Sequence, residues 1–200
     1  MTWYNASNIS AEEYHCAYCG NVVSSSRGAN RKSAPGGSHA QVETEAKLVI
    51  CPHCDMPTVI VRNGMARVQY PGEAYGRPVD SLPDDVSSVY DEMRKAYQAG
   101  AYTACVLLSR KLLMHIAVEA GAAPGKSFME YVSYLDAAGY LPPNGKAWVD
   151  RIRSMANAAN HELGLSTDED ARMLIDFSSM VLQFSYEYPA MVGAVPFQRD

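Results

Sequence analysis

The feature that most constrains this chain is a pair of Cys-X-X-Cys motifs in its first third. Cys16 and Cys19 form the first motif, and Cys51 and Cys54 form the second. Two intervening residues let both sulfurs of a motif point into one turn, and two such turns facing each other complete a tetrahedral site. A small module of this kind has too little core to fold without its metal. The sequence therefore predicts one structural Zn²⁺ ion held by these four cysteines.

The spacing between the motifs is longer than usual. The 31 residues between Cys19 and Cys51 exceed the about 15–20 of a common zinc ribbon. A polar stretch rich in Gly and Ser, residues 24–41, explains the excess as a flexible insert. The alternative to zinc is two disulfides or redox pairs. We favour zinc because cytosolic chains rarely keep structural disulfides and a redox dithiol needs only one motif.

The remaining His and Cys residues are not expected to be ligands. With four cysteines available, we expect His15, His39 and His53 to be exposed or to lie outside the ligand shell. Cys105 lies in an apolar stretch, so we expect it to be a small core residue.

Residues 1–70 otherwise predict short strands. The turn signal Asn63-Gly64 separates the β-prone residues 58–62 from residues 66–70 and predicts a hairpin. We therefore interpret residues 1–70 as a small β-rich zinc ribbon. Residues 71–82 contain several Pro and Gly residues that block regular structure, so they are expected to be a linker.

The chain from residue 83 to residue 190 carries helical signals. Pro83 suits a first helical turn, and Ser166 with Glu169 predicts a capping box at the start of the last helix. Gly or Pro residues mark the expected helix ends. The expected helices are residues 83–99, 101–121, 127–138, 144–162 and 166–188. Short connections predict a compact bundle, followed by a tail at residues 191–200. The predicted fold class is mainly α: a five-helix bundle preceded by a small β-rich zinc ribbon.

The formal net charge of −5 lies entirely in the helical part. Residues 1–80 hold seven basic and seven acidic residues, and residues 81–200 hold ten basic and fifteen acidic ones. Nonspecific nucleic-acid binding usually needs a basic surface, so any contact with DNA or RNA must be local or made together with a partner. The N-terminus does not have the pattern of a signal peptide, and the most apolar stretch, residues 101–108, is far shorter than the about 20 residues of a membrane span. We expect a cytoplasmic protein without a membrane segment.

A polar stripe lies on the fourth expected helix. Arg153, Asn157 and His161 are spaced four residues apart, so they lie along one side of a helix. One hypothesis is that these are buried polar residues that tie helices together. The other is an active site, in which His161 moves protons, Arg153 holds a phosphate and Asn157 orients one of them. Such a trio could cleave RNA without metal by helping a 2′-hydroxyl attack the neighbouring phosphate.

Two segments carry a resemblance to a known family. The Gly100-Ala101-Tyr102 turn with Arg110, followed by the Arg153-Asn157-His161 helix, resembles an uncharacterised helical family of the HEPN superfamily that is associated with restriction endonucleases. The resemblance covers about residues 83–190, and the upstream zinc ribbon is similar to what many members carry. It implies an HEPN-like bundle with a role near nucleic acid in bacterial defence or restriction. It also implies possible metal-independent ribonuclease activity, because many HEPN proteins use an Arg and a His of one helix, paired across a dimer.

Three functional hypotheses follow. The first is a non-catalytic accessory or adaptor module that binds nucleic acid or a partner protein, within bacterial defence or restriction. The second is an HEPN-type endoribonuclease that uses Arg153 and His161. Seven residues separate these two, more than is usual in such nucleases, which favours the first hypothesis. The third is an unrelated structural helical protein. We also expect a homodimer, because C₂ dimers are the commonest assembly.

Overall fold

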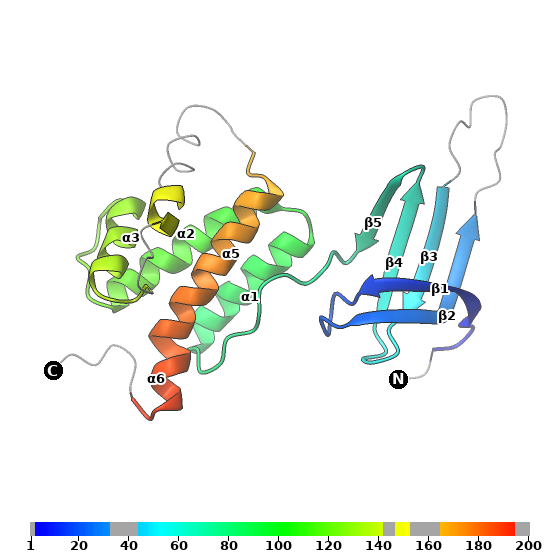
Figure 1. Cartoon of the computed structure of the whole chain (residues 1–200), viewed down its shortest axis with the longest axis horizontal. Helices are drawn as coiled ribbons and strands as arrows, with labels where there is room; N and C mark the ends of the chain where they lie inside the picture. Colours follow the sequence, from blue (N-terminus) through cyan, green and yellow to red (C-terminus); the bar gives the residue numbers. More distant parts are fainter. Residues whose placement is uncertain (1–2, 33–43, 142–146, 153–164, 195–200) are drawn as a thin grey trace. The chain divides into compact units, whose positions relative to one another are not determined.

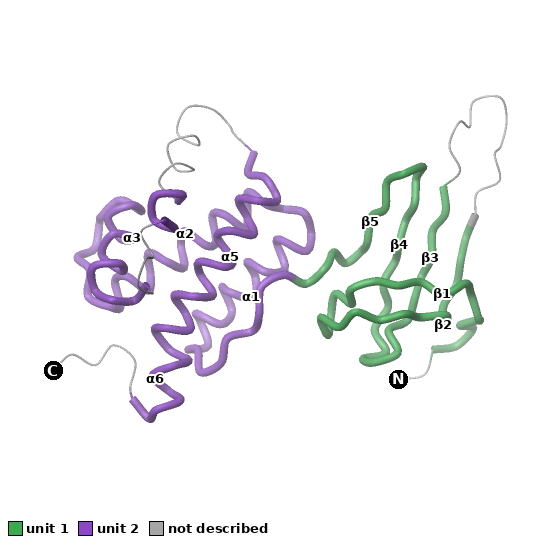
Figure 2. Tube along the Cα trace, viewed as in Figure 1, with its two compact units in different colours: residues 1–74 green, residues 75–200 purple. Residues whose placement is uncertain are grey.

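The computed structural model describes residues 3–32, 44–141, 147–152 and 165–194 of the chain. The chain divides into two compact units, residues 1–74 and residues 75–200 (Figure 2). We call them the N-terminal unit and the helical unit. The N-terminal unit is built from β-strands and the helical unit from helices (Figure 1).

The N-terminal unit contains a five-stranded antiparallel sheet in which the strands follow each other in chain order. Its strands are β1 (Ser7–His15), β2 (Val22–Lys32), β3 (Thr44–Ile50), β4 (Pro57–Asn63) and β5 (Ala66–Tyr70). The first Cys-X-X-Cys motif lies in the β1–β2 connection and the second in the β3–β4 connection. The expected hairpin at Asn63-Gly64 is confirmed, since Asn63 pairs with Ala66 across a two-residue loop.

The predicted fold class, mainly α, is wrong. The five-stranded sheet makes the chain a mixture of β and α structure. The sequence analysis did not predict β1 and β2, because both are largely polar. They form strands by pairing with their neighbours in the sheet. Gly28 shows how closely β2 approaches β3, because an added Cβ there would lie 1.9 Å from the carbonyl oxygen of Leu48.

The expected flexible insert, residues 24–41, also needs correction. Its first part, through Lys32, belongs to β2 and pairs with β1 and β3. Polar residues dominate here because most β2 side chains are exposed, so the composition resembles that of a loop. The rest of the expected insert lies outside the described residues.

Side chains of β5 reach across to β1, the other end of the strand order. Gln69 Nε2 donates to the carbonyl oxygen of His15 at 2.8 Å, and Arg67 Nη2 donates to that of Glu13 at 3.1 Å. The sheet is therefore curled, and its inner face encloses a small apolar cluster with the cysteines. This cluster contains the buried side chains of Tyr14, Cys16, Val49, Cys51 and Ile60.

The helical unit is organised around one central helix. Its elements are α1 (Asp84–Gln98), α2 (Tyr102–Glu119), α3 (Phe128–Ala137), a helical segment at residues 147–152, α5 (Asp168–Leu182), the π-helical turn η1 (Gln183–Glu187) and α6 (Tyr188–Met191). Helix α2 contacts α1, α3 and α5, as its continuous apolar sequence predicts. The first three expected helices are confirmed to within two residues, and Cys105 of α2 is fully buried, as expected. Most of the fourth expected helix lies outside the described residues.

The last expected helix differs at both ends. Its capping box is formed by Thr167 and Asp170 rather than by Ser166 and Glu169: the backbone N–H of Asp170 donates to Thr167 Oγ1 at 3.2 Å, and that of Thr167 donates to Asp170 Oδ2 at 2.9 Å. Pro189 does not end the helix. It lies in α6, directly after the π-helical turn η1, and the backbone on either side of the junction, at Glu187 and Tyr188, keeps helical angles.

The expected linker, residues 71–82, is partly wrong. From Tyr75 onward the chain belongs to the helical unit. Arg94 of α1 donates to the carbonyl oxygens of Tyr75 and Gly76 at 3.1 and 2.8 Å, and the hydroxyl of Tyr90 donates to that of Arg77 at 2.9 Å. These bonds bind the segment to α1.

Within the described part of the chain, no helix combines the length and the apolar character needed to span a bilayer.

Candidate metal centre

The two Cys-X-X-Cys motifs form turns with the same hydrogen bonds. In the first turn, Cys16 N donates to Asn21 O at 2.9 Å and Gly20 N donates to Cys16 O at 3.0 Å. The second turn repeats both bonds: Cys51 N donates to Met56 O at 2.9 Å, and Asp55 N donates to Cys51 O at 3.0 Å. The residue after each motif, Gly20 or Asp55, has a positive φ, 71° and 61° respectively. The chain therefore presents two copies of one cysteine-bearing turn.

The two turns bring all four predicted ligands together. The Sγ atoms of Cys16 and Cys54 are 3.6 Å apart, and those of Cys19 and Cys51 are 3.8 Å apart. All four sulfurs lie within 4.8 Å of one another. The first cysteine of each motif is buried and the second is partly exposed. Among the described residues this cluster could hold a metal ion, as the spacing of the cysteines predicts.

Hydrogen bonds and burial act on the sulfurs in opposite directions. The backbone N–H of Asn21 lowers the pKa of the Cys19 thiol to about 6. Burial raises the pKa of the Cys54 thiol to about 12, and adjacent sulfurs add to this rise. Thiolates held this close repel one another unless a cation lies among them. The site thus favours a bound cation, which would keep all four sulfurs deprotonated.

A buried aromatic ring lies behind the sulfurs. Tyr14 is 3% exposed, and burial, with the nearby cysteines as further causes, raises the pKa of its hydroxyl. The hydroxyl has no hydrogen-bond partner among the described residues. Val49 and Ile60 complete this apolar wall. The wall keeps water from one side of the cluster, which strengthens electrostatic attraction between thiolates and a cation.

Residues far along the chain hold the second turn. The indole Nε1 of Trp3 donates to the carbonyl oxygen of Asp55 at 2.9 Å, and the guanidinium of Arg27 pairs with the Asp55 carboxylate. The imidazoles of His15 and His53 are exposed and do not belong to the sulfur cluster, as expected. His39 lies outside the described residues.

The predicted catalytic residues Arg153, Asn157 and His161 lie outside the described residues. The residue two positions before Arg153 is described: Arg151 Nη2 pairs with Glu169 Oε1 of α5 at 2.6 Å. The catalytic role of the three residues stays a prediction.

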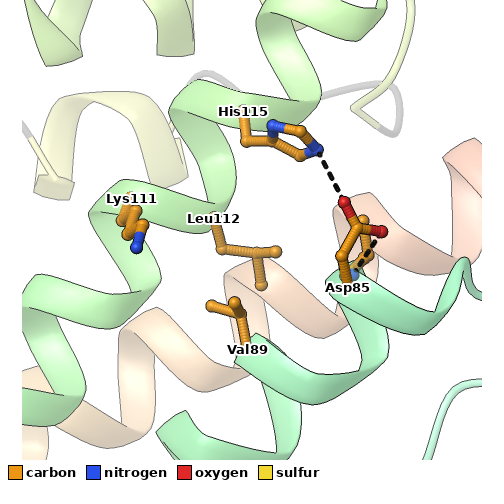
Figure 3. A pocket seen from close by; sticks show the side chains of 6 residues that line it. Asp85, Val89, Lys111, Leu112 and His115 are labelled. Atoms are coloured by element: carbon orange, nitrogen blue, oxygen red, sulfur yellow. Dashed lines mark hydrogen bonds and ion pairs between the residues drawn. The ribbon is translucent and has the colours of Figure 1, made fainter.

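A histidine that the sequence reasoning missed lies in the helical unit. A hollow of about 160 Å³ between α1 and α2 has Val89 and Leu112 in its lining and His115 at its rim (Figure 3). The Nε2 atom of His115 lies 3.8 Å from Asp85 Oδ2 and 3.4 Å from Glu119 Oε1. The four-residue spacing of His115 and Glu119 on α2 was the available sequence signal. Both contacts are ion-pair distances on a partly exposed side chain, and the group is not among the residues that could hold a metal ion in the described part of the chain.

The comparisons with known proteins concern the helical part. Residues 91–195 match the model of a domain of unknown function, DUF4145. No curated protein and no solved structure matches the chain. The matched region covers more than half of the chain and excludes the four cysteines of the candidate metal centre. The chain therefore belongs to the DUF4145 family, with a cysteine-bearing β unit placed before the family domain.

Proposed function

We propose that Cys16, Cys19, Cys51 and Cys54 hold one structural zinc ion, and that the chain is a non-catalytic accessory module that binds nucleic acid or a partner protein. The sulfur geometry carries the zinc part of this proposal. Zinc–sulfur bonds of about 2.3 Å require tetrahedron edges of about 3.8 Å, and the sulfur pairs Cys16–Cys54 and Cys19–Cys51 are 3.6 and 3.8 Å apart. Four thiolates fill a tetrahedral ion completely, which suits a structural role because a catalytic zinc keeps one position open.

The helical unit gives the proposal its context. The family match covers the same helices as the resemblance to HEPN proteins. We therefore propose an HEPN-related domain that works in bacterial defence or restriction, in the cytoplasm and as a homodimer. Light scattering at high protein concentration tests the last point, and a mass equal to one chain would contradict it.

Elemental analysis of the purified protein tests the metal. We expect one zinc per chain in the wild type and loss of zinc in Cys51→Ser. Cys105→Ser is the matched control: it removes one thiol from the chain, but Cys105 is buried in α2 of the helical unit and does not belong to the sulfur cluster. A wild type without zinc, or a Cys51→Ser protein with the full amount, would overturn the zinc proposal.

Incubation with single-stranded RNA in the presence of a chelator tests the non-catalytic role. We expect the RNA to stay intact. If the wild type cleaves it and equally folded His161→Ala and Arg153→Ala proteins do not, the chain is instead a metal-independent endoribonuclease. Asn157→Ala would then show whether the third residue of the stripe contributes.

A further inference from the structure

A buried carboxylate on β1 is surrounded by basic side chains from three other strands. Glu12 is only 4% exposed. Its Oε2 accepts from Lys47 Nζ and from Arg62 Nη1, both at 3.0 Å, and its Oε1 accepts from Arg62 Nη2. Arg67 Nε lies 3.7 Å from Oε1. One carboxylate thus holds three cations in place.

The arrangement of these cations is unfavourable without further negative charge. Arg62 and Arg67 occupy directly opposite positions on β4 and β5, and like charges in opposite positions destabilise a sheet. Glu45 extends the same cross-strand row on β3, opposite Arg62. Together with Glu12 and Lys47, this row contains three basic and two acidic side chains. The surplus is positive, although the N-terminal unit as a whole is close to neutral.

The surplus of positive charge around Glu12 is not needed to hold the curled sheet together. Lys47 and Arg62 already satisfy both oxygens of Glu12. Arg67 makes only the longer approach to Glu12 and one hydrogen bond to the carbonyl oxygen of Glu13. The side chains of Arg62 and Arg67 remain 34% and 35% exposed. They are therefore held by neighbours and still accessible to a ligand from solvent.

We propose that Arg62 and Arg67, positioned by Glu12, form a binding site for phosphate groups. Guanidinium groups bind phosphate oxygens with two parallel hydrogen bonds, and a side chain that is already held loses less entropy on binding. The site lies at the hairpin end of β4, whereas the cysteine turn precedes the other end of this strand. This inference rests on the proposed function, because it selects nucleic acid, through its phosphates, as the partner. Free phosphate offers the same chemistry.

Fluorescence anisotropy with a labelled single-stranded RNA oligonucleotide tests the site across a range of salt concentrations. Arg67→Gln is the main variant because Arg67 contributes least to holding Glu12. We expect its affinity to fall about tenfold, as for the loss of one charged hydrogen bond. The slope of log K against log salt should fall by about 0.7 for each phosphate that the variant no longer binds. Arg62→Gln should act in the same direction, with circular dichroism and zinc content to confirm its fold.

Arg31→Gln is the matched control, because it removes the same charge from an exposed position. Arg31 lies in register with Ala46, which pairs with Val61, the neighbour of Arg62 on β4. Adjacent residues of a strand point to opposite faces, so Arg31 lies on the other face of the sheet. Its affinity for RNA should stay within about twofold of the wild type, because Arg31 lies on the opposite face from the site and the attraction of an exposed charge is weakened by salt.

Inorganic phosphate distinguishes the two sources of the ligand. In NMR spectra of the wild type, phosphate should shift the Nε–H signals of Arg62 and Arg67 and compete with RNA. If phosphate shifts these signals but RNA does not bind, the site takes free phosphate. Equal RNA affinity of wild type and Arg67→Gln, or an equal loss in Arg31→Gln, overturns the site. So does a wild type that binds neither ligand. In each case the zinc content still tests the proposed metal centre separately.

Discussion

The Glu12 carboxylate of β1 makes ion pairs with side chains of β3, β4 and β5. Burial raises the pKa of its carboxyl group, but the hydrogen bonds from Arg62 and Lys47 outweigh burial and hold the pKa below its usual range. Its partners lie 35 and 50 residues away along the chain. The sequence alone therefore gives no local signal that this glutamate differs from Glu13 beside it. The cysteines were predictable because two Cys-X-X-Cys motifs in one chain are a recognisable metal-binding pattern, even though the sulfurs of Cys16 and Cys54 belong to different motifs.

Glu12→Gln should destabilise the N-terminal unit by about 3 kcal/mol at pH 7, chiefly because it leaves the buried ammonium group of Lys47 without its counter-charge. The folded-state pKa of Glu12 lies below the unfolded value of about 4.3. The ion pairs therefore contribute stability that is complete above about pH 4.3 and is lost as the pH falls through the folded-state pKa. Urea unfolding, followed by Trp3 fluorescence in a Trp148→Phe background, should show a constant difference between wild type and variant from about pH 8 to about pH 5. A difference that disappears on going from neutral pH to that lower limit would contradict the lowered pKa.

Gly76 occupies a position that other residues cannot adopt easily. Its φ is +74°, and a Cβ there would lie 2.4 Å from Cγ2 of Ile175 on α5. Gly76→Ala should therefore cost about 1–2 kcal/mol for the left-handed backbone and about 1–3 kcal/mol more for the overlap with α5. Gly100→Ala is the control, since Gly100 has a φ of +72° with no atom near the added methyl. Thermal unfolding should show the larger loss for Gly76→Ala; equal losses would mean that the overlap relaxes without cost.

At the scale of elements, helices were predictable and strands were less so. Helices α1, α2 and α3 begin and end at local signals, such as Ser127, which forms a capping box with Glu130 at the start of α3. Strands β1 and β2 have no comparable signal, because their pairing and not their composition makes them strands. The π-helical turn η1 between α5 and α6 was also missed, since nothing in its sequence differs from an ordinary helix.

The N-terminus of α5 allows a direct test of the capping register. Thr167→Ala removes the hydroxyl that accepts from Asp170 N and should destabilise the helical unit by about 1 kcal/mol. Ser166→Ala is the matched control, because the bond from Ser166 to Thr103 uses the Ser166 backbone N–H and survives the change. Thermal denaturation followed by circular dichroism compares the two. A larger loss for Ser166→Ala would favour the capping box expected from the sequence.

At the scale of the whole molecule, the two units have separate apolar cores. The core of the helical unit contains residues of α1, α2, α3 and α5, whereas the small cluster of the N-terminal unit contains two of the four cysteines. The sequence predicted two parts, residues 1–70 and 83–190, with a linker at residues 71–82 between them. It could not predict that Tyr75 already belongs to the helical unit, because the bonds that hold this segment come from Tyr90 and Arg94 of α1.

Because the cores are separate, metal removal should unfold one unit and leave the other intact. The small cluster around Cys16 and Cys51 is too limited to compensate for the conformational entropy of its strands without the metal. Each unit contains one tryptophan, so fluorescence can follow them separately: Trp3 in a Trp148→Phe protein and Trp148 in a Trp3→Phe protein.

A strong chelator should shift the Trp3 emission to that of an unfolded chain and leave the Trp148 emission and the helical circular dichroism unchanged. Trp148 suits this purpose because its ring lies against Phe177 of α5, with 6.0 Å between the ring centroids. Added zinc should restore the Trp3 signal. If chelation instead changes both tryptophans together, the units unfold as one. If chelation changes neither signal, the N-terminal unit stays folded without a metal. The hydrogen bonds of the sheet and the ion pairs of Glu12 are then sufficient to hold it.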